Sequence, residues 1–205
     1  MLSHVLVKVA DLDRAVADYR ALGFVVHYAS KRHAHIWFTD GPIIELLTTP
    51  RKAEWLKRPI NLFWGKGSGT RMARWARAGD GFCDVAVLTD EPADAGVPIG
   101  KVISWKRDGI TFRFAYPRNP QLPFLVTPYD PPRHPAEIVH PNGATGLTRV
   151  VMEIHLDDLA EFERLVGDDP TFKYAAGPVT RVIAIELSGL TGDLDPVLLH
   201  GIRII

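Results

Sequence analysis

The first fifty residues change from one hydrophobic period to another, and these periods predict a small folding unit. Residues 3–10 carry apolar side chains at every second position, as in a strand with one buried face. Residues 12–22 carry them three and four positions apart, which is the period of a helix with one buried face. Asp11 is suited to cap the start of this helix, and Gly23 is suited to end it. The pattern therefore predicts a strand followed by an amphipathic helix.

Three more strands are predicted in the remainder of this unit. They cover residues 24–29, 33–39 and 42–49, which are short runs rich in apolar, aromatic and β-branched side chains. The dipeptide Asp40-Gly41 separates the last two runs and is a strong signal for a tight hairpin. The order of elements in residues 1–50 is therefore strand, helix and three strands (βαβββ).

Polar side chains interrupt these strands at a few positions. Glu45 lies within the apolar run PIIELL, where an ionised carboxylate is costly unless it is paired or bound to a cation. His4 lies in the first strand, and His35 and Trp37 share one face of the third because side chains alternate along a strand. These positions are candidates for the lining of a functional cavity. A salt bridge for Glu45 and ordinary packing for the others are also consistent with the pattern.

Residues 81–130 repeat the unit with a shortened helix. The predicted strands of this second copy are residues 82–89, 102–105, 110–116 and 122–127. Residues 90–96 supply only a short turn in place of the helix. Aligned on the first unit, the second copy places Asp84 opposite the strand histidine and Leu125 or Val126 opposite the carboxylate.

Residues 148–205 form a partial third copy. Its predicted elements are a strand at residues 148–154, a helix at 157–166 and strands at 182–187 and 196–205. The same alignment places Arg149 opposite the strand histidine and Glu186 opposite the carboxylate. Arg149 beside a metal ion would be repelled by it, and pairing between Arg149 and Glu186 is the simpler interpretation.

Two connectors separate the three copies. Residues 51–80 are basic and include a predicted helix at 71–78, and their GKGSG segment lacks the spacing of a phosphate-binding loop. Residues 131–147 are a proline-containing extended connector. A single βαβββ unit cannot cover both faces of its sheet, whereas two side by side close a curved sheet with helices outside and a cavity inside. We therefore expect residues 1–50, 51–80, 81–130, 131–147 and 148–205 to form one compact unit.

The composition limits the partners that the protein can have. The chain has 205 residues, of which 46% are hydrophobic and 23% are charged, as in an ordinary globular protein with a sizeable core. Its 24 basic and 24 acidic residues cancel, so no overall field favours nucleic acid or a membrane. The single cysteine, Cys83, suits a reducing compartment. With no signal-peptide pattern and no apolar run long enough to span a bilayer, we expect a cytoplasmic protein.

The sequence resembles a known superfamily. HVLVKVADLDRAVADYRALGF and PIIELL are similar to a module of the vicinal oxygen chelate superfamily, which includes glyoxalase I, extradiol dioxygenases and bleomycin-resistance proteins. The later segment LPFLVTPYDPPRHPAEIVHPNGATGLTRV is similar to its glyoxalase-like domain branch. The resemblance implies an α+β fold, in which repeated βαβββ modules form a curved mixed sheet around a cavity with helices outside.

The resemblance also implies a metal site. In this superfamily, inward side chains on the first and fourth strands of two paired modules hold a divalent metal. His4 and Glu45 match the pair of the first module, with Glu45 as ligand and catalytic base, and Asp84 is the candidate third ligand. Imidazole and carboxylate ligands suit Zn²⁺, Mn²⁺, Fe²⁺ or Ni²⁺. The apolar Leu125 or Val126 departs from the pattern.

Two functions remain open from the sequence. The first is a metal-dependent lyase, isomerase or dioxygenase that acts on a small oxygenated substrate. The second is a metal-free protein of the resistance type that binds or sequesters a small molecule. In both, His35, Trp37 and His140 are the candidate contacts to the ligand. A small molecule is the expected partner, without nucleic acid or membrane, and a homodimer is compatible with the scaffold.

Overall fold

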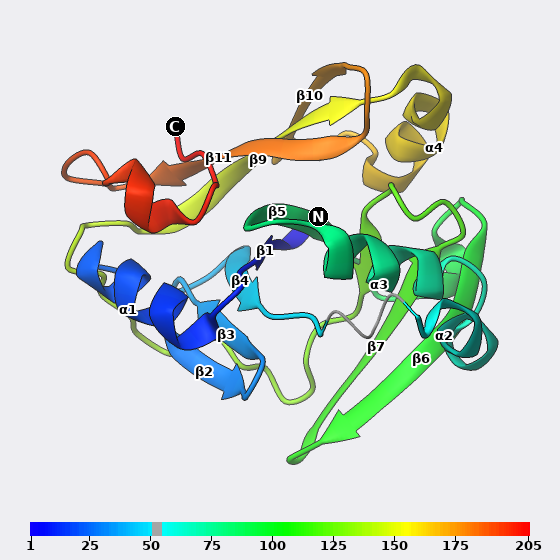
Figure 1. Cartoon of the computed structure of the whole chain (residues 1–205), viewed down its shortest axis with the longest axis horizontal. Helices are drawn as coiled ribbons and strands as arrows, with labels where there is room; N and C mark the ends of the chain where they lie inside the picture. Colours follow the sequence, from blue (N-terminus) through cyan, green and yellow to red (C-terminus); the bar gives the residue numbers. More distant parts are fainter. Residues whose placement is uncertain (51–54) are drawn as a thin grey trace.

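The computed structural model describes residues 1–50 and 55–205, which form two β-sheets and their covering helices (Figure 1). In chain order the elements are β1 (Leu2–Lys8), α1 (Leu12–Ala21), β2 (His27–Ser30), β3 (His33–Ile36), β4 (Ile43–Leu47), α2 (Lys57–Trp64), α3 (Ser68–Arg77), β5 (Gly81–Leu88), η2 (Pro92–Asp94), β6 (Ile99–Arg107), β7 (Ile110–Pro117), β8 (Phe124–Val126), β9 (Gly146–Ile154), α4 (Leu156–Val166), β10 (Phe172–Ala176), β11 (Arg181–Ser188) and η3 (Pro196–Leu199). Residues 51–54, the start of the predicted basic connector, lie outside the described residues. None of the described helices is long and apolar enough to cross a membrane.

The larger sheet joins the first two predicted copies along β1 and β5. Its eight strands follow the order β2-β3-β4-β1-β5-β8-β7-β6. β1 is parallel to β4 in the first copy, β5 is parallel to β8 in the second, and β1 pairs with β5 in antiparallel fashion. The first and last strands of each copy therefore stand at the centre of the sheet. The structure confirms the predicted α+β fold with a curved mixed sheet.

The two faces of this sheet differ in what packs on them. On the convex face, Val5 and Val7 of β1 join the main core together with the buried side of α1. The Asp11 carboxylate caps α1 as predicted, because it accepts a hydrogen bond from the amide of Arg14 at 3.1 Å. On the concave face, Leu6 joins a second cluster that is rich in aromatic side chains from α3, β7 and β8. The alternation along β1 thus separates the main core from a second, aromatic cluster on the concave face.

The third copy forms a separate sheet and does not extend the first. Its strands follow the order β10-β9-β11, and its apolar side chains, such as Val150 and Met152, join the main core with Val85 and Val87 of β5. Figure 1 shows this sheet lying across β5. The helix of the second copy is only the three-residue η2, which cannot cover the convex face of its own module. The third copy therefore covers the part of the convex face of the second module that η2 is too short to cover.

One predicted strand is wrong, and two short elements escape the sequence patterns. The strand expected at residues 196–205 is the 3-10 helix η3, because Asp195 caps it at the amide of Val197 and Pro196 suits its first position. Ile204 alone returns to the smaller sheet, as an isolated bridge. The two short elements are the strand β10 and the helix α2.

Candidate functional site

Glu45 lies in the middle of β4 on the concave face, and the neighbouring strands surround it with histidines. β1 pairs with β4 so that Leu6 lies beside Glu45, and β3 pairs with β4 so that His35 lies opposite it. His4 and His33 are two residues away from these partners, and they share their face because side chains alternate along a strand. An apolar strand with one carboxylate is therefore flanked by strands that carry imidazoles.

Three imidazoles contact this carboxylate. Nδ1 of His33 is hydrogen-bonded to Oε1 of Glu45 at 2.5 Å. Nε2 of His4 lies 3.4 Å from Oε2, and Nε2 of His35 lies 3.7 Å from Oε1. The side chains of His4 and His35 are 9% exposed, whereas that of His33 is 42% exposed. The structure thus brings the predicted residues His4, Glu45 and His35 together and adds His33, which alone of these three histidines is open to solvent.

The charge states of this cluster follow from burial and from its hydrogen bonds. Burial opposes ionisation of Glu45, but the imidazoles of His33 and His35 outweigh it and hold the pKa of the carboxyl well below its usual range. Burial also disfavours the charged form of His33, but its hydrogen bond to Glu45 outweighs this and raises the His33 pKa. Burial lowers the pKa of His4, and the attraction of Glu45 only partly opposes this shift. Near neutral pH the cluster therefore holds an ionised Glu45 and a neutral His4.

Aromatic rings from both modules pack against the histidines. The ring of Phe124 in β8 meets His4 edge-on, with centroids 5.4 Å apart. Trp37 meets His35 in the same way at 5.2 Å, which places Trp37 beside the cluster as the sequence predicts for a ligand contact. These rings limit the access of water to one side of the carboxylate.

Tyr129 extends this aromatic wall. Its ring lies 6.4 Å from that of Trp37, and the ring of Phe112 in β7 lies 5.1 Å from Tyr129. Burial raises the pKa of Tyr129, and the charge of Glu45 raises it further. A neutral phenol and apolar rings thus stand next to the carboxylate, as in a site for the apolar part of a small molecule.

Asp84, the candidate third metal ligand, is held by other partners. Its Oδ2 atom accepts hydrogen bonds from Nη1 of Arg71 at 2.5 Å, Nη2 of Arg74 at 2.7 Å and Nε1 of Trp75 at 2.7 Å. All three donors come from α3, which packs on the concave face. In residues 1–50 and 55–205, no group of three or more His, Cys, Asp or Glu side chains could hold a metal ion. The structure therefore does not bring Asp84 to His4 and Glu45 as a shared ligand set.

The position opposite Glu45 in the second module is apolar, as the alignment indicates. β8 pairs with β5 so that Phe124 lies beside Ala86 and Val126 beside Leu88. Phe124 and Val126 join the aromatic cluster of the concave face, while Leu125 points into the main core. The second module offers no ligating side chain at this position.

His140 lies on the other side of the sheet and fastens the proline-containing connector. Its Nδ1 accepts a hydrogen bond from the amide of Val25 at 2.9 Å, and its Nε2 lies 2.9 Å from the carbonyl oxygen of Trp37. Its ring packs edge-on against Phe24 and Phe38, which belong to the main core. Both ring nitrogens are therefore engaged by the backbone, and the structure does not bring His140 to Glu45.

Arg149 and Glu186 pair with each other on the smaller sheet. Nη1 of Arg149 lies 3.0 Å from Oε2 of Glu186, and the two side chains are 50% and 20% exposed. These residues occupy the positions in the third copy that correspond to His4 and Glu45 in the first. The third copy takes no part in the site on the concave face.

Two residues with a large effect on the site, His33 and Arg71, have no place among the sequence-based candidates. His33 shares the face of His35 two positions away, so strand alternation was the available signal. Arg71 lies in a basic helix whose composition is typical of a solvated surface, yet its side chain is fully buried. The spacing of Arg71 and Trp75, four apart on one helix face, was the only hint of an inward direction.

Comparison with known proteins identifies the family. Residues 2–166 match the model of the glyoxalase-like domain family. No curated protein sequence matches the chain. Among solved structures, the chain is similar to the Mn(II)-bound glyoxalase from Novosphingobium aromaticivorans, with 11% identity, 91% of this chain and 64% of that chain covered, and a TM-score of 0.56.

Other solved structures resemble parts of the chain. A variant of the Streptomyces coelicolor methylmalonyl-CoA epimerase in complex with 2-nitronate-propionyl-CoA is 23% identical over 62% of this chain and 95% of that chain, with a TM-score of 0.42. A catechol 2,3-dioxygenase is 13% identical over 91% of this chain and 74% of that chain, with a TM-score of 0.48. At these identities the likeness concerns the fold alone. With its paired modules and the match over residues 2–166, the chain belongs to the glyoxalase-like domain family of the vicinal oxygen chelate superfamily.

Proposed function

We propose that this chain is an enzyme that moves a proton on a small oxygenated substrate, with His33 as the acid–base group and Glu45 as its partner. One observation carries the proposal: His33 is bound at 2.5 Å to Glu45, whose side chain is 14% exposed, while 42% of the His33 side chain is exposed. A carboxylate behind an accessible imidazole is the arrangement that orients and strengthens a histidine base. This favours an isomerase or a lyase over the other activities found in the superfamily.

The hydrogen bond sets the tautomer of His33. Glu45 is ionised and can only accept, so the proton of the neutral imidazole stays on Nδ1 and the lone pair is on Nε2. In the proposed step, Nε2 removes a proton from a carbon next to a carbonyl, and the electron pair of the broken C–H bond moves to the carbonyl oxygen. The imidazolium that forms is stabilised by the charge of Glu45. Return of the proton to carbon completes an isomerisation, and loss of a leaving group completes an elimination.

The aromatic wall supports binding of the substrate in the same proposal. Trp37, Tyr129 and Phe124 make the surroundings of the cluster apolar, which suits a flat or apolar portion of a small molecule. Exclusion of water by these rings strengthens the interaction between Glu45 and the imidazolium. The wall thus serves both recognition and chemistry.

A divalent metal is implied by the superfamily, but the residues present do not fit its two-module ligand set. His4 and Glu45 are of the types that Zn²⁺, Mn²⁺, Fe²⁺ and Ni²⁺ accept. In the second module, however, Asp84 is engaged by two guanidinium groups, and the position opposite Glu45 is apolar. Guanidinium groups beside the site would also repel a dication. We therefore derive no step through a metal ion.

A second function, binding or sequestration of a small molecule without turnover, is favoured by the aromatic wall. It requires the rings of Trp37 and Tyr129 but no proton transfer at His33. The two functions make different predictions for a variant that keeps the aromatic wall and removes only the acid–base group.

The experiment measures exchange of carbon-bound hydrogen for deuterium in D₂O, by NMR, with 2-oxo acids, 2-hydroxy ketones and acyl thioesters as probes. His33→Asn keeps a donor near Glu45 but cannot accept a proton at Nε2, so exchange should fall about a hundredfold or more. His27→Asn, which changes an exposed histidine of the adjacent strand β2, is the matched control and should leave exchange unchanged.

Equal exchange by His33→Asn and the unchanged protein would contradict the proposed base. Tryptophan quenching by a probe that undergoes no exchange would instead support sequestration. The same reactions are run with EDTA and with added Mn²⁺ or Zn²⁺, and a strict requirement for either metal would sink the metal-independent mechanism.

A further inference from the structure

α2 exposes most of its apolar side chains. Leu62 and Phe63 are each 72% exposed, the preceding Trp55 is 85% exposed, and Leu56 is 49% exposed. No residue of α2 is buried. A helix in water normally turns its apolar side toward a core, so this grouping indicates a surface that is covered by something else.

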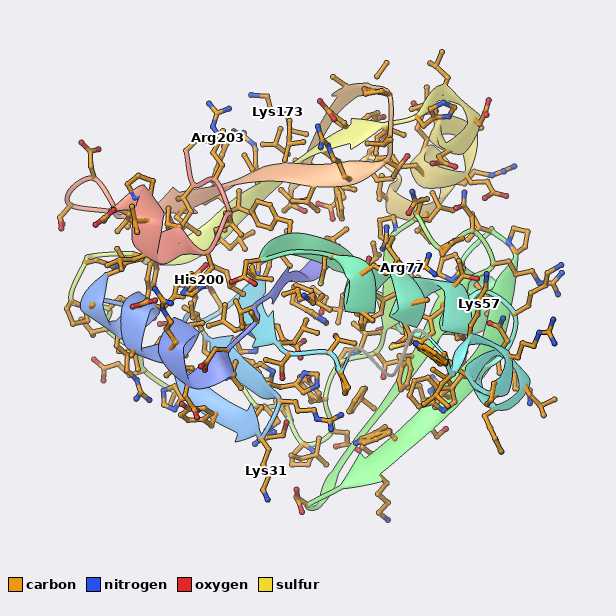
Figure 2. The ribbon with its side chains drawn as sticks, viewed as in Figure 1. Lys31, Lys57, Arg77, Lys173, His200 and Arg203 are labelled. Atoms are coloured by element: carbon orange, nitrogen blue, oxygen red, sulfur yellow. The ribbon has the colours of Figure 1, made fainter. Side chains whose placement is uncertain are left out.

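The surroundings of these side chains are basic. Residues 55–70 contain Lys57, Arg58 and Lys66 and no aspartate or glutamate, whereas the later Arg71 and Arg74 turn inward to Asp84. Lys57 and Lys66 are exposed at the two ends of α2. Figure 2 shows Lys57 at the edge of the molecule that α2 forms. In a chain with no net charge, this segment concentrates positive charge beside exposed apolar groups.

The edge strand β6 continues this basic surface. Nζ of Lys101 in β6 donates a hydrogen bond to the carbonyl oxygen of Leu62 at 3.1 Å. Gly65 packs so closely on β6 that a Cβ atom there would lie 2.4 Å from the amide nitrogen of Lys101. Residues 99–106 contain two cations, Lys101 and Lys106, and no acid, and Trp105 is 40% exposed. α2 and the neighbouring part of β6 therefore form one surface, which we call the α2–β6 surface.

Two exposed apolar residues elsewhere in the described chain have acidic neighbours. Leu156 is 70% exposed but is followed by Asp157 and Asp158 in the first turn of α4. Val197 is 80% exposed and lies next to the capping Asp195 and Pro196. Single apolar side chains among acids are ordinary surface features. The α2–β6 surface differs because it combines several large apolar side chains with cations only.

We propose that the α2–β6 surface docks on an anionic lipid bilayer. Tryptophan, phenylalanine and leucine side chains can enter the boundary between head groups and acyl chains while lysine and arginine meet the anionic head groups. The sequence-based expectation of no membrane contact rests on the lack of a spanning segment and on the cancelling charges of the whole chain. A helix that lies on a surface needs no spanning segment, and a local group of cations can bind an anionic surface without a net charge on the chain.

A second copy of the chain fits this surface less well. A symmetric dimer through α2 would bring the cations Lys57, Arg58 and Lys101 of both copies together without acidic partners from this surface. An anionic surface neutralises the same charges. The proposal does not depend on the acid–base role of His33, because His33 lies in β3 and is not part of the α2–β6 surface.

The experiment uses the full chain and sedimentation with lipid vesicles. We expect binding to vesicles that contain phosphatidylglycerol, little binding to vesicles of phosphatidylcholine alone, and weaker binding as salt is raised. The variant Leu62→Ser/Phe63→Ser should lower the bound fraction roughly tenfold or more, since two large apolar side chains no longer enter the lipid. Lys57→Gln/Arg58→Gln should weaken binding and reduce its dependence on salt. Leu156→Ser, at a matched exposed leucine in an acidic setting, should have no effect.

The positions changed are largely exposed, so all variants should melt with the unchanged protein. The proposal is overturned if the chain does not sediment with anionic vesicles, or if Leu62→Ser/Phe63→Ser binds as well as the unchanged protein. It is also overturned if light scattering finds a dimer that the same variant converts to a monomer, because the surface would then belong to a second copy.

Discussion

The concave face carries one carboxylate from each module, and the two carboxylates are held by partners of different kinds. Glu45 of the first module is held by imidazoles, whose protonation changes near neutral pH. Asp84 of the second module is held by the guanidinium groups of Arg71 and Arg74, which stay charged at every physiological pH. The same scaffold thus presents a carboxylate whose partners can exchange protons and a carboxylate whose partners cannot.

Burial separates the two carboxylates in the same way. The side chains of Arg71 and Asp84 are 0% and 2% exposed, so their ion pair is closed to ligands. His33 is 42% exposed and connects Glu45, which is 14% exposed, to the solvent side of the site. We infer that the carboxylate of the second module serves stability and that of the first serves chemistry, although the two do not occupy equivalent positions of the repeat. A fold family is therefore a poor guide to function until the partners of each side chain are known.

The largest effect should follow from breaking the buried pair of the second module. Arg71→Met removes the fully buried guanidinium and leaves Asp84 with only the side chains of Arg74 and Trp75, so unfolding free energy should fall by about 3–5 kcal/mol. Urea unfolding followed by circular dichroism measures this change. The double variant Arg71→Met/Asp84→Leu should recover part of the loss, because it also removes the carboxylate that has lost its buried partner. Strictly additive losses would show that Arg71 and Asp84 do not act as a pair.

Much of the fold could be predicted from the sequence, because the periods that define it are local. The alternation in residues 3–10 and the helical spacing in residues 12–22 correspond to β1 and α1, including the Asp11 cap. The choice of partner for the first module was not accessible, since pairing of β1 with β5 depends on contacts between segments that lie far apart along the chain. The separate sheet of the third copy was not accessible for the same reason, because it too depends on contacts between distant segments.

The site was predictable only where the fold itself determines it. His4 and Glu45 meet because the first and fourth strands of a module are neighbours. The partners of Asp84 depend on which side of the basic helix α3 turns inward. The composition of that helix does not indicate that Arg71 is fully buried. The bond between His33 and Glu45 depends on the register of the β3–β4 hairpin, which places imidazoles of alternate residues along one edge of the carboxylate.

A pH series can sharpen the contrast between the two carboxylates. The raised pKa of His33 means that its pairing with Glu45 stabilises the fold fully below the usual histidine value of 6.5 and is lost as pH rises through the raised value. The lowered pKa of Glu45 means that its contribution is present above its usual value of 4.5 and is lost as pH falls toward the lowered value. The pairing of His33 with Glu45 should therefore contribute most to stability between pH 4.5 and pH 6.5.

The measurement is the difference in unfolding free energy between the unchanged protein and His33→Asn at several pH values. His4, whose lowered pKa acts in the opposite direction, is present in both proteins and largely cancels. The difference should shrink above pH 6.5 as His33 loses its proton. The corresponding difference for Arg71→Met should stay level over the same range, because a guanidinium does not titrate there. NMR titration should place the His33 pKa above 6.5 and lower it in Glu45→Gln.

The smallest effect should follow from breaking the ion pair between Arg149 and Glu186 in the third copy. These residues are also joined at 3.0 Å, but Arg149 is 50% exposed and solvent competes for both groups. Lys173, at 3.9 Å from the same carboxylate, can compensate for a lost partner. Arg149→Met should therefore change unfolding free energy by about 0–1 kcal/mol, measured in the same urea series as Arg71→Met. A loss as large as that of Arg71→Met would show that burial and the kind of partner do not decide what each carboxylate contributes.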